Sequence, residues 1–260
     1  MFSHFKWLRY ECPAIFFLCL ALRVSVFMLL LQKLIVHKLA HAGLCALTLL
    51  LCEIPLLLRL FGFYTPPLFE LIVTLFAMSA NIFGEIFEFY LIFPFWDSVL
   101  HFIWGFLAAL FGISFFEAIS NNSEWTASLS PMLFALLALS FAALTSVFWE
   151  IFEYGMDCIF LTDMQKDCYL SSVNSILLNP AGVNVPVREE ISSVVINGSA
   201  WISYIDIGLN DTMSDILFNT FGSLISSVML FFGCRRGKTP VVFLLLAPRR
   251  LYSGKDDTSP

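Results

Sequence analysis

Acidic side chains at the ends of apolar segments are the residues of this sequence that could do chemistry. They form two similar sets, each made of two glutamates three residues apart and an acidic step at the start of the next apolar segment. The sets are Glu85 and Glu88 with Asp97 and His101, and Glu150 and Glu153 with Asp211 and Asp215. Ionisable groups in membrane segments are costly unless they are paired, solvated or bound to metal, so this repeated cluster predicts a functional site.

Helical spacing predicts that each set lies on one stripe of its helix. Residues at i, i+4 and i+7 share a helical face, and the two stripes are Asn81–Glu85–Glu88 and Ser146–Glu150–Glu153–Asp157. The segments that carry the glutamates end where the segments that carry the aspartates begin. All four helix ends therefore lie on the same side of a membrane, and we expect these carboxylates and the imidazole of His101 to converge at one depth.

The charge of this cluster predicts a compensating cation or bound protons. The glutamates lie in the last turns of their helices, where the helix dipole disfavours negative charge, and no Lys or Arg lies in these helix ends. Carboxylates with one imidazole suit Mg²⁺, Mn²⁺, Ca²⁺ or Fe²⁺ better than soft metals. The predicted ligands are Glu85, Glu88, Asp97, His101, Glu150, Glu153, Asp211 and Asp215, and the predicted catalytic residues are His101, Glu85 and Glu150.

Structural roles account for several of these residues equally well. Asp97 and Asp211 are suited to cap the helices that they open. Thr212 with Asp215 matches a capping box, and a buried histidine such as His101 is more often a hydrogen-bonded packing residue than a ligand.

The composition indicates an all-α polytopic membrane protein. Of the 260 residues, 59% are hydrophobic and 13% charged, and the mean hydropathy is +0.84, too apolar for an ordinary soluble domain. Apolar segments of about 20 residues can span a bilayer. Six such segments are predicted, at Ala14–Val36, Leu39–Phe61, Pro67–Tyr90, Phe95–Glu117, Ser130–Met156 and Thr212–Gly233.

Basic residues predict the orientation of these spans. Lys and Arg are concentrated at the two ends of the chain, which places both termini in the cytoplasm by the positive-inside rule, although Lys33 and Lys38 weigh mildly against this. The location predicted is the cell membrane, and the first span is too long for a cleaved signal peptide. We divide the chain into a two-helix hairpin (1–66), a four-helix core (67–233) and a cytoplasmic tail (234–260), in which 241–247 is expected to be interfacial.

One pair of opposite charges is predicted inside the membrane. Arg23 and Glu53 each lie about fifteen residues from the turn near His37. An antiparallel hairpin places them at similar depth, so we expect a structural Arg23–Glu53 ion pair.

The outer loop, residues 157–210, is expected to contain a small β-element. Asn197–Gly198 is typical of a type I′ hairpin between Ile191–Ile196 and Ser199–Ile207. Residues 183–187 are expected to form an extended edge. Cys158 and Cys168 share the loop, where they could form a disulfide or remain free thiols.

Three steps of the sequence resemble the YjdF-like bacterial inner-membrane proteins. They are Phe95–Gly105, with its aromatic-Asp-x-x-x-His-x-x-x-Gly pattern, Phe148–Tyr154, with aromatic-Glu-x-x-Glu, and Asp211–Asp215 followed by Gly222. Leu161–Gln165 resembles the Gly-Thr-x-x-Gln turn of that family, with Leu161 where Gly is usual. Asp215–Gly222 is more weakly similar to VanZ-like proteins. The resemblance covers about residues 67–233 and implies a polytopic membrane protein of a family without a settled activity.

The sequence leaves three functions open. The first is a metal-dependent enzyme that acts on a lipid-linked or envelope substrate, with metal-activated water and a carboxylate or His101 as general base. The second is a cation- or proton-coupled transporter, although the two hairpins form a parallel repeat and many transporters use inverted ones. The third is a non-catalytic scaffold. The bilayer is the expected partner, and no nucleic-acid patch, phosphate-binding Gly loop or Ser or Cys nucleophile beside a base is present.

Overall fold

The computed structural model describes residues 12–120, 129–206, 208–236 and 249–250. The expected interfacial segment at 241–247 lies outside these residues. Within them, six helical segments are long and apolar enough to cross a membrane. They are Pro13–Ile35, Leu39–Leu60, Pro67–Ile86, Trp96–Phe116, Pro131–Phe160 and Leu209–Arg235, which confirms the predicted all-α polytopic fold.

Prolines mark where several of these helices begin. Proline lacks the backbone N–H that a helix cannot use in its first turn, and its φ angle is already helical. Accordingly α2 (Pro13–Ile35), α5 (Pro67–Met78) and α9 (Pro131–Phe160) each start at a proline. The second span is made of α3 (Leu39–Leu51) and α4 (Ile54–Leu60), which has Pro55 in its first turn. The remaining long helices are α7 (Trp96–Ser120) and α10 (Leu209–Arg235).

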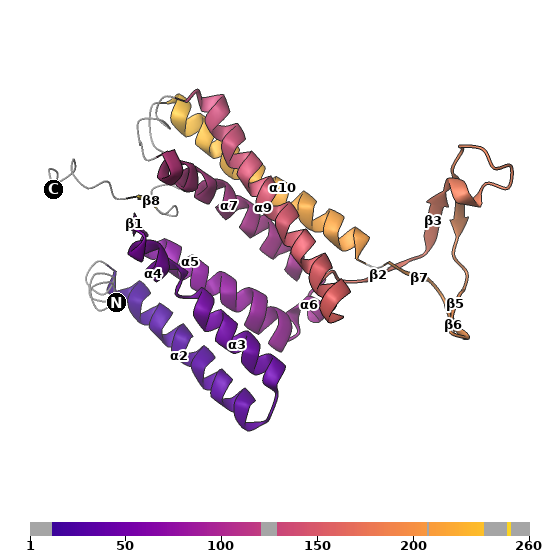
Figure 1. Cartoon of the computed structure of the whole chain (residues 1–260), viewed down its shortest axis with the longest axis horizontal. Coiled ribbons are helices and arrows are strands. Elements are labelled where there is room, and N and C mark those ends of the chain that lie inside the picture. Colours follow the sequence, from indigo (N-terminus) through magenta and orange to yellow (C-terminus); the bar gives the residue numbers. More distant parts are fainter. Residues whose placement is uncertain (1–11, 121–128, 207, 237–248, 251–260) are drawn as a thin grey trace. The chain divides into compact units, whose positions relative to one another are not determined.

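The chain forms two compact units. The larger unit contains residues 1–145 and 218–260, and the smaller unit contains residues 146–217. In the larger unit, α2, α3 and α5 pack side by side (Figure 1). Their buried core consists of Val26, Cys45, Met78, Ile82 and Ile86.

A second core of the larger unit joins α7 to parts of α9 and α10. Small side chains of α7, such as Ala108 and Ala109, pack against Ala138 of α9 and Leu230 of α10. Gly105 and Gly222 allow α7 and α10 to approach closely, because a Cβ at Gly105 would overlap the backbone of Asn219 and a Cβ at Gly222 would overlap the backbone of Phe102. Small residues are the usual means by which membrane helices come into backbone contact. Both glycines belong to the steps that carry the family resemblance.

The predicted Arg23–Glu53 ion pair is confirmed and extends to a third residue. Arg23 Nε lies 3.5 Å from Glu53 Oε1, and Arg23 Nη1 lies 3.2 Å from Glu70 Oε1. The Nη2 group of Arg23 also donates a hydrogen bond to the Cys52 carbonyl at 2.7 Å. Glu70, with a side chain 1% exposed, is the most deeply buried member. Glu70 lies in the first turn of α5 and was not among the residues expected to pair.

The third span departs from the expected α-helix. Beyond α5 it continues as a π-helix, η1 (Ser79–Ile86), which ends before Glu88 in the left-handed conformation with φ 59°. A π-helix bonds i to i+5 and has a wider turn than an α-helix. The expected α-helical stripe of Asn81, Glu85 and Glu88 is therefore wrong. The short α6 (Phe89–Ile92) then leads to α7.

The smaller unit contains the outer loop, which holds three two-stranded antiparallel ladders. β2 (Cys168–Leu170) pairs with β7 (Tyr204–Asp206), and β3 (Ser172–Ser175) pairs with β4 (Val187–Glu190). β5 (Val194–Ile196) pairs with β6 (Ser199–Trp201) across Asn197 and Gly198, whose φ angles are 48° and 82°. The positive φ angles at both turn residues confirm the predicted hairpin.

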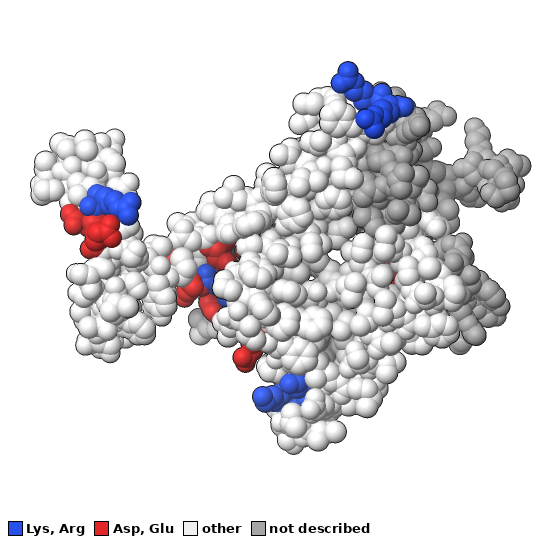
Figure 2. Space-filling view, turned by 180° about the vertical axis from the view of Figure 1, so that it is seen from behind, with Lys and Arg blue, Asp and Glu red and all other residues white. Residues whose placement is uncertain are grey.

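Other expectations for the loop are corrected. Of residues 183–187, only Val187 belongs to a strand, at the start of β4, and η2 (Ile176–Leu178) is a 3₁₀ turn that was not expected. Cys158 and Cys168 are free thiols. In the larger unit, β1 (Phe63–Tyr64) pairs with β8 (Arg249–Arg250) of the tail. Figure 2 shows that charged side chains gather in a few small groups on the visible face of the molecule.

Candidate functional site

Three predicted ligands meet inside the smaller unit. Glu150 and Glu153 come from α9 and Asp215 comes from α10, and a carboxylate oxygen from each lies within 4.8 Å of the other two. Their exposed fractions are 5%, 7% and 1%. The indole Nε1–H of Trp149 donates a hydrogen bond to Glu153 Oε1 at 2.8 Å, which fixes the orientation of that carboxylate.

The spacing of these oxygens is the right size for one ion. Two oxygens that each lie about 2.0–2.6 Å from a Mg²⁺ or Ca²⁺ ion can be at most about 4–5 Å apart. The three-residue step from Glu150 to Glu153 places both side chains near one face of α9. The three carboxylates could therefore bind the same hard cation, or share protons, without a change of backbone.

A second pair of predicted site residues lies in the larger unit. Asp97 and His101 are four residues apart on α7, and His101 Nε2 lies 3.7 Å from Asp97 Oδ1. His101 is buried and Asp97 is partly exposed. Since α7 begins at Trp96, Asp97 belongs to the first helical turn and is not the residue that caps it.

The other two glutamates of the first set are more accessible. Glu85 and Glu88 are both exposed in the larger unit. Glu85 is in η1, whereas Glu88 lies between η1 and α6. The convergence of all eight predicted ligands on one site stays a prediction.

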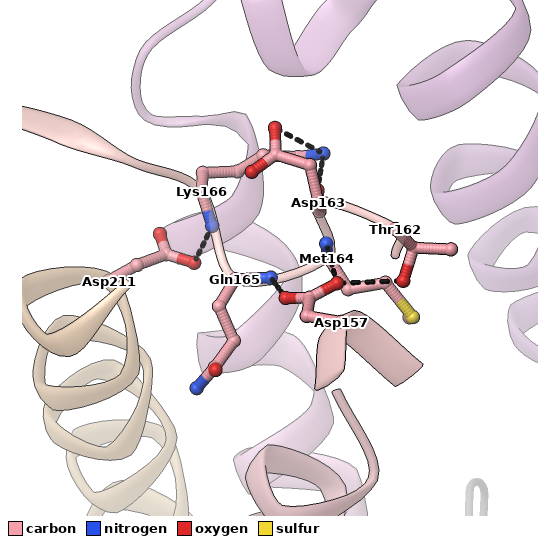
Figure 3. Close-up of polar contacts among 7 residues, drawn as sticks. All are labelled: Asp157, Thr162, Asp163, Met164, Gln165, Lys166 and Asp211. Carbon is pink, nitrogen blue, oxygen red and sulfur yellow. Dashed lines mark hydrogen bonds and ion pairs between the residues drawn. The ribbon is translucent and has the colours of Figure 1, made fainter. Parts of the chain in front are cut away.

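Asp211 and Asp157 hold a tight turn, shown in Figure 3. Asp157 Oδ1 accepts hydrogen bonds from Thr162 Oγ1 and from the backbone N–H of Met164, both at 2.7 Å. Its Oδ2 accepts one from the N–H of Gln165 at 2.8 Å. Asp211 Oδ2 accepts the next N–H, that of Lys166, at 2.8 Å. The turn is thereby fixed to the end of α9 and to the start of α10.

The start of α10 is capped by a residue that sequence reasoning missed. Because α10 begins at Leu209, Asp211 and Thr212 lie within its first turns, so the expected N-cap at Asp211 and the expected capping box at Thr212 are wrong. Asp206 Oδ2 accepts hydrogen bonds from the backbone N–H and the side chain of Asn210 at 2.8 and 2.9 Å. Gly208, with φ 89°, provides the bend between Asp206 and the helix. Asp206, two residues before Gly208, was the feature of the sequence that could have indicated the start of α10.

Thr212 and Cys168 complete the contacts at this helix start. The hydroxyl of Thr212 accepts a hydrogen bond from the Gln165 side chain. Cys168 Sγ lies 3.8 Å from Asp206 Oδ2. Burial, together with the negative charge of Asp206, raises the pKa of the Cys168 thiol, so this cysteine stays protonated and is a poor nucleophile.

An open apolar groove of about 180 Å³ lies on the larger unit. It is formed by α7, by the residue just before α7 and by α10, and its lining residues are Phe95, Ser98, Val99, Phe102, Phe218 and Phe221. Asp97 and His101 occupy positions next to Ser98 and Phe102 in the sequence of α7. An apolar groove in a membrane span faces lipid chains and is the kind of surface to which they can pack.

A stripe of buried polar side chains follows α10 through the larger unit. Asn219, Ser223 and Ser226 are each 0% exposed, and Ser227 is 3% exposed. The spacing i, i+4, i+7 and i+8 keeps them on one helical face. The side-chain amide of Asn219 has no hydrogen-bond partner among the described residues. Buried polar groups without partners are rare in native proteins and indicate an unseen water or ion.

Comparison with known proteins gives a family and no individual relative. A family model described as "Predicted membrane protein (DUF2238)" matches residues 14–236. The matched range contains all three steps that resemble the YjdF-like proteins, so the expected membership of a membrane protein family is confirmed. Neither a curated protein nor a solved structure matches the chain.

Proposed function

Because this chain belongs to the DUF2238 family of predicted membrane proteins, whose description names no activity, we propose a function from its acidic site. The protein binds a divalent cation at Glu150, Glu153 and Asp215 and uses the cation on a lipid-linked or envelope substrate. The observation that carries this proposal is the set of three buried carboxylates with oxygens within 4.8 Å of one another.

Electrostatics favours a cation at these carboxylates. Like charges so close together require an opposite charge or shared protons. Neither α9 nor α10, as far as Cys234, contains a Lys or Arg. Carboxylate oxygens select hard ions, which are Mg²⁺, Mn²⁺, Ca²⁺ or Fe²⁺ in this proposal.

The other predicted ligands, Glu85, Glu88, Asp97, His101 and Asp211, stay predictions, and Asp211 Oδ2 accepts the backbone N–H of Lys166. A cation held by Glu150, Glu153 and Asp215 would supply Lewis-acid activation of a water molecule. One of the predicted catalytic residues, His101, Glu85 or Glu150, then acts as general base.

The apolar groove supports the proposal of a lipid-linked substrate. Its lining residues Ser98 and Phe102 directly follow Asp97 and His101 in α7. Its phenylalanines would hold an aliphatic chain.

The second candidate function is a cation- or proton-coupled transporter. The buried polar stripe of α10 favours it, because intramembrane polar groups commonly line ion paths. Asn219, the first member of the stripe, follows Asp215 by four residues in α10. A transported ion could therefore pass from a carboxylate to an amide and then to hydroxyl groups.

The proposed location is the cell membrane, with both termini in the cytoplasm. Arg235 and Arg236 at the end of α10 support this orientation. The acidic site would then lie on the outer side of the membrane.

The deciding experiment measures metal bound to the purified full-length protein. Protein purified without chelators and supplied with divalent cations is analysed by elemental mass spectrometry. Wild type is compared with Glu150→Gln/Glu153→Gln and with Glu189→Gln/Glu190→Gln, a matched pair of exposed acids on β4. We expect about one ion per chain in wild type and in the β4 variant, and a loss of at least tenfold in the α9 variant.

The outcomes separate the alternatives. Absence of metal from wild type would overturn the cation proposal and favour bound protons, which proton flux into proteoliposomes would then test. Bound metal together with ion flux favours transport. Bound metal without flux or turnover, and unfolding when the metal is chelated, would identify a structural ion in a scaffold.

A further inference from the structure

The outer loop contains a segment that exposes apolar side chains without having a core of its own. We define the arm as residues 168–206, all of which the structure describes. Among them only Asp206 is buried. Leu177 is 90% exposed, Ile202 is 87% exposed and Val195 is 67% exposed. Large exposed apolar surfaces on proteins mark sites of contact with another protein or with a membrane.

The secondary structure of the arm does not account for its stability. Its three ladders each have two strands, and an isolated two-stranded hairpin is at best marginally stable in water. Stable hairpins normally pack one face against a core. The apolar faces of the arm therefore require an apolar surface from outside the arm.

The charges of the arm are few and are confined to one strand and one end. Arg188, Glu189 and Glu190 lie together on β4, and Asp206 closes β7. Arg188 Nε and Glu190 Oε1 form an ion pair at 3.3 Å. Figure 2 shows the charged side chains of the arm as one compact group on an otherwise uncharged surface. Such a distribution leaves the rest of the arm free of the desolvation cost that charges would impose at a lipid surface.

The connection of the arm to the membrane spans makes the bilayer the apolar surface within reach. α9 leaves the bilayer at the same side at which α10 enters it, and the arm joins these two helices. The turn held by Asp157 and Asp211 fixes residues 162–166 to both helix ends (Figure 3). β2 begins at Cys168, two residues beyond this turn, so the arm starts close to the ends of both helices.

The residue types of the arm match the interfacial region of a bilayer. Tyr169, Trp201 and Tyr204 are at least 40% exposed. Tyrosine and tryptophan combine an apolar ring with a polar group and are enriched where lipid headgroups meet the acyl chains. Leu177 and Ile202 provide purely apolar side chains that can enter the acyl boundary.

We propose that the arm is a monotopic element that lies on the outer surface of the bilayer, with Leu177 and Ile202 inserted among the lipids and β4 facing water. This function is independent of the proposed metal site. It places the polypeptide that follows the acidic helix ends in contact with lipid headgroups.

Photo-cross-linking of the full-length protein in lipid nanodiscs tests the proposal. p-Benzoylphenylalanine replaces Leu177 or Ile202 in separate variants. Glu189 on the charged strand is the matched exposed control, and Leu136, exposed on α9, is the positive control for lipid contact. Intact mass spectrometry measures the addition of one lipid, and gel electrophoresis measures cross-linked dimers.

We expect lipid adducts at positions 177 and 202 at yields within about twofold of position 136, and at least fivefold lower at position 189. Dimers at 177 and 202 in place of lipid adducts would overturn the proposal in favour of pairing between two copies. Adduct yields at 177 and 202 that equal the yield at 189 would show that the arm lies in water. Because both positions are exposed, the replacements leave the fold intact, and retention of the monodisperse elution profile checks this.

Discussion

At the scale of single residues, backbone conformation explains a departure from the family pattern. Leu161 stands where the resembling turn usually has glycine, and its φ angle is 55°. It follows α9 directly and is 88% exposed. A left-handed residue after a helix is a common way to end it, and glycine adopts this conformation without steric cost. Leucine provides no compensating contact here.

Leu161→Gly is therefore expected to stabilise the protein. Relief of the left-handed strain, roughly 1–2 kcal/mol, outweighs the extra freedom of glycine in the unfolded chain, roughly 0.5–1 kcal/mol. The expected gain is about 0.5–1 kcal/mol, measured as a higher midpoint of thermal unfolding. Leu177→Gly is the control, since Leu177 is equally exposed but does not have a positive φ. An equal gain in both variants would contradict the explanation.

One of the two ion pairs of Arg23 could be predicted from the sequence and the other could not. The pairing with Glu53 followed from the equal depth of two residues in one hairpin. The contact with Glu70 depends on how α5 packs against α2, and helix packing is not encoded in the hydrophobic pattern of either helix alone. The structure makes Glu70 the more deeply buried partner of Arg23.

Arg23→Gln is expected to destabilise the protein strongly. It removes the Arg23 guanidinium from the buried Glu70 carboxylate, and removal of one partner of a buried ion pair costs about 3–5 kcal/mol. Arg23→Gln/Glu70→Gln removes that carboxylate as well and is expected to be more stable than Arg23→Gln alone. Glu53→Gln is the comparison, with a loss below about 1 kcal/mol because Glu53 is partly exposed. Chemical unfolding in detergent measures all three, and a double variant no more stable than Arg23→Gln would refute the coupling.

For the helices and strands, the sequence predicted which elements exist and of which type they are, but it predicted their exact bounds and backbone geometry less well. The six spans follow from hydropathy, and the β5–β6 hairpin follows from Asn197–Gly198. The π-helix η1 and the early start of α10 were missed, because each depends on which backbone hydrogen bonds form within a continuous apolar helix. The same reason explains two differences at the predicted site. Glu88 lies outside the helix in which it was expected, and Asp211 accepts a hydrogen bond from the backbone N–H of Lys166.

Substitution by alanine is expected to have opposite effects at a glycine in the crossing of α7 and α10 and at a glycine in open space on α3. Gly222→Ala forces a Cβ against the backbone of Phe102 and is expected to cost about 1–3 kcal/mol through overpacking. Gly43→Ala in α3 meets no atom within 4 Å and is expected to gain about 0.5–1 kcal/mol, because alanine favours the helix. Thermal unfolding of the two purified variants gives the comparison, and a Gly222→Ala protein as stable as wild type would show that the helices are farther apart.

At the scale of the whole molecule, hydropathy determines that the chain crosses a membrane repeatedly, and the number of spans determines which loops share a side. The division into a larger and a smaller unit could not be predicted, because it separates residues within α9 and within α10 that are contiguous in sequence. Which reaction or transport the acidic site supports also depends on groups that no hydropathy pattern specifies.

Two native cysteines test the proposed orientation. Cys158 is exposed near the end of α9, and Cys234 is partly exposed near the end of α10. Because α10 crosses the membrane, the two thiols lie on opposite sides. A membrane-impermeant maleimide is expected to label Cys158 in intact cells and Cys234 after the membrane is opened, with Cys158→Ser and Cys234→Ser assigning each signal. The reverse order would place the termini outside.

The larger unit is assembled from two stretches of the chain, and this has a consequence for biosynthesis. Its second core includes Leu230 of α10, which is synthesised after α7 and α9. Domains generally fold in the order in which they are synthesised, but this core cannot close until translation of α10 is complete. During that interval Gly105 and its neighbours on α7 face lipid or an insertion factor. A nascent chain arrested before residue 218 therefore has an incomplete second core.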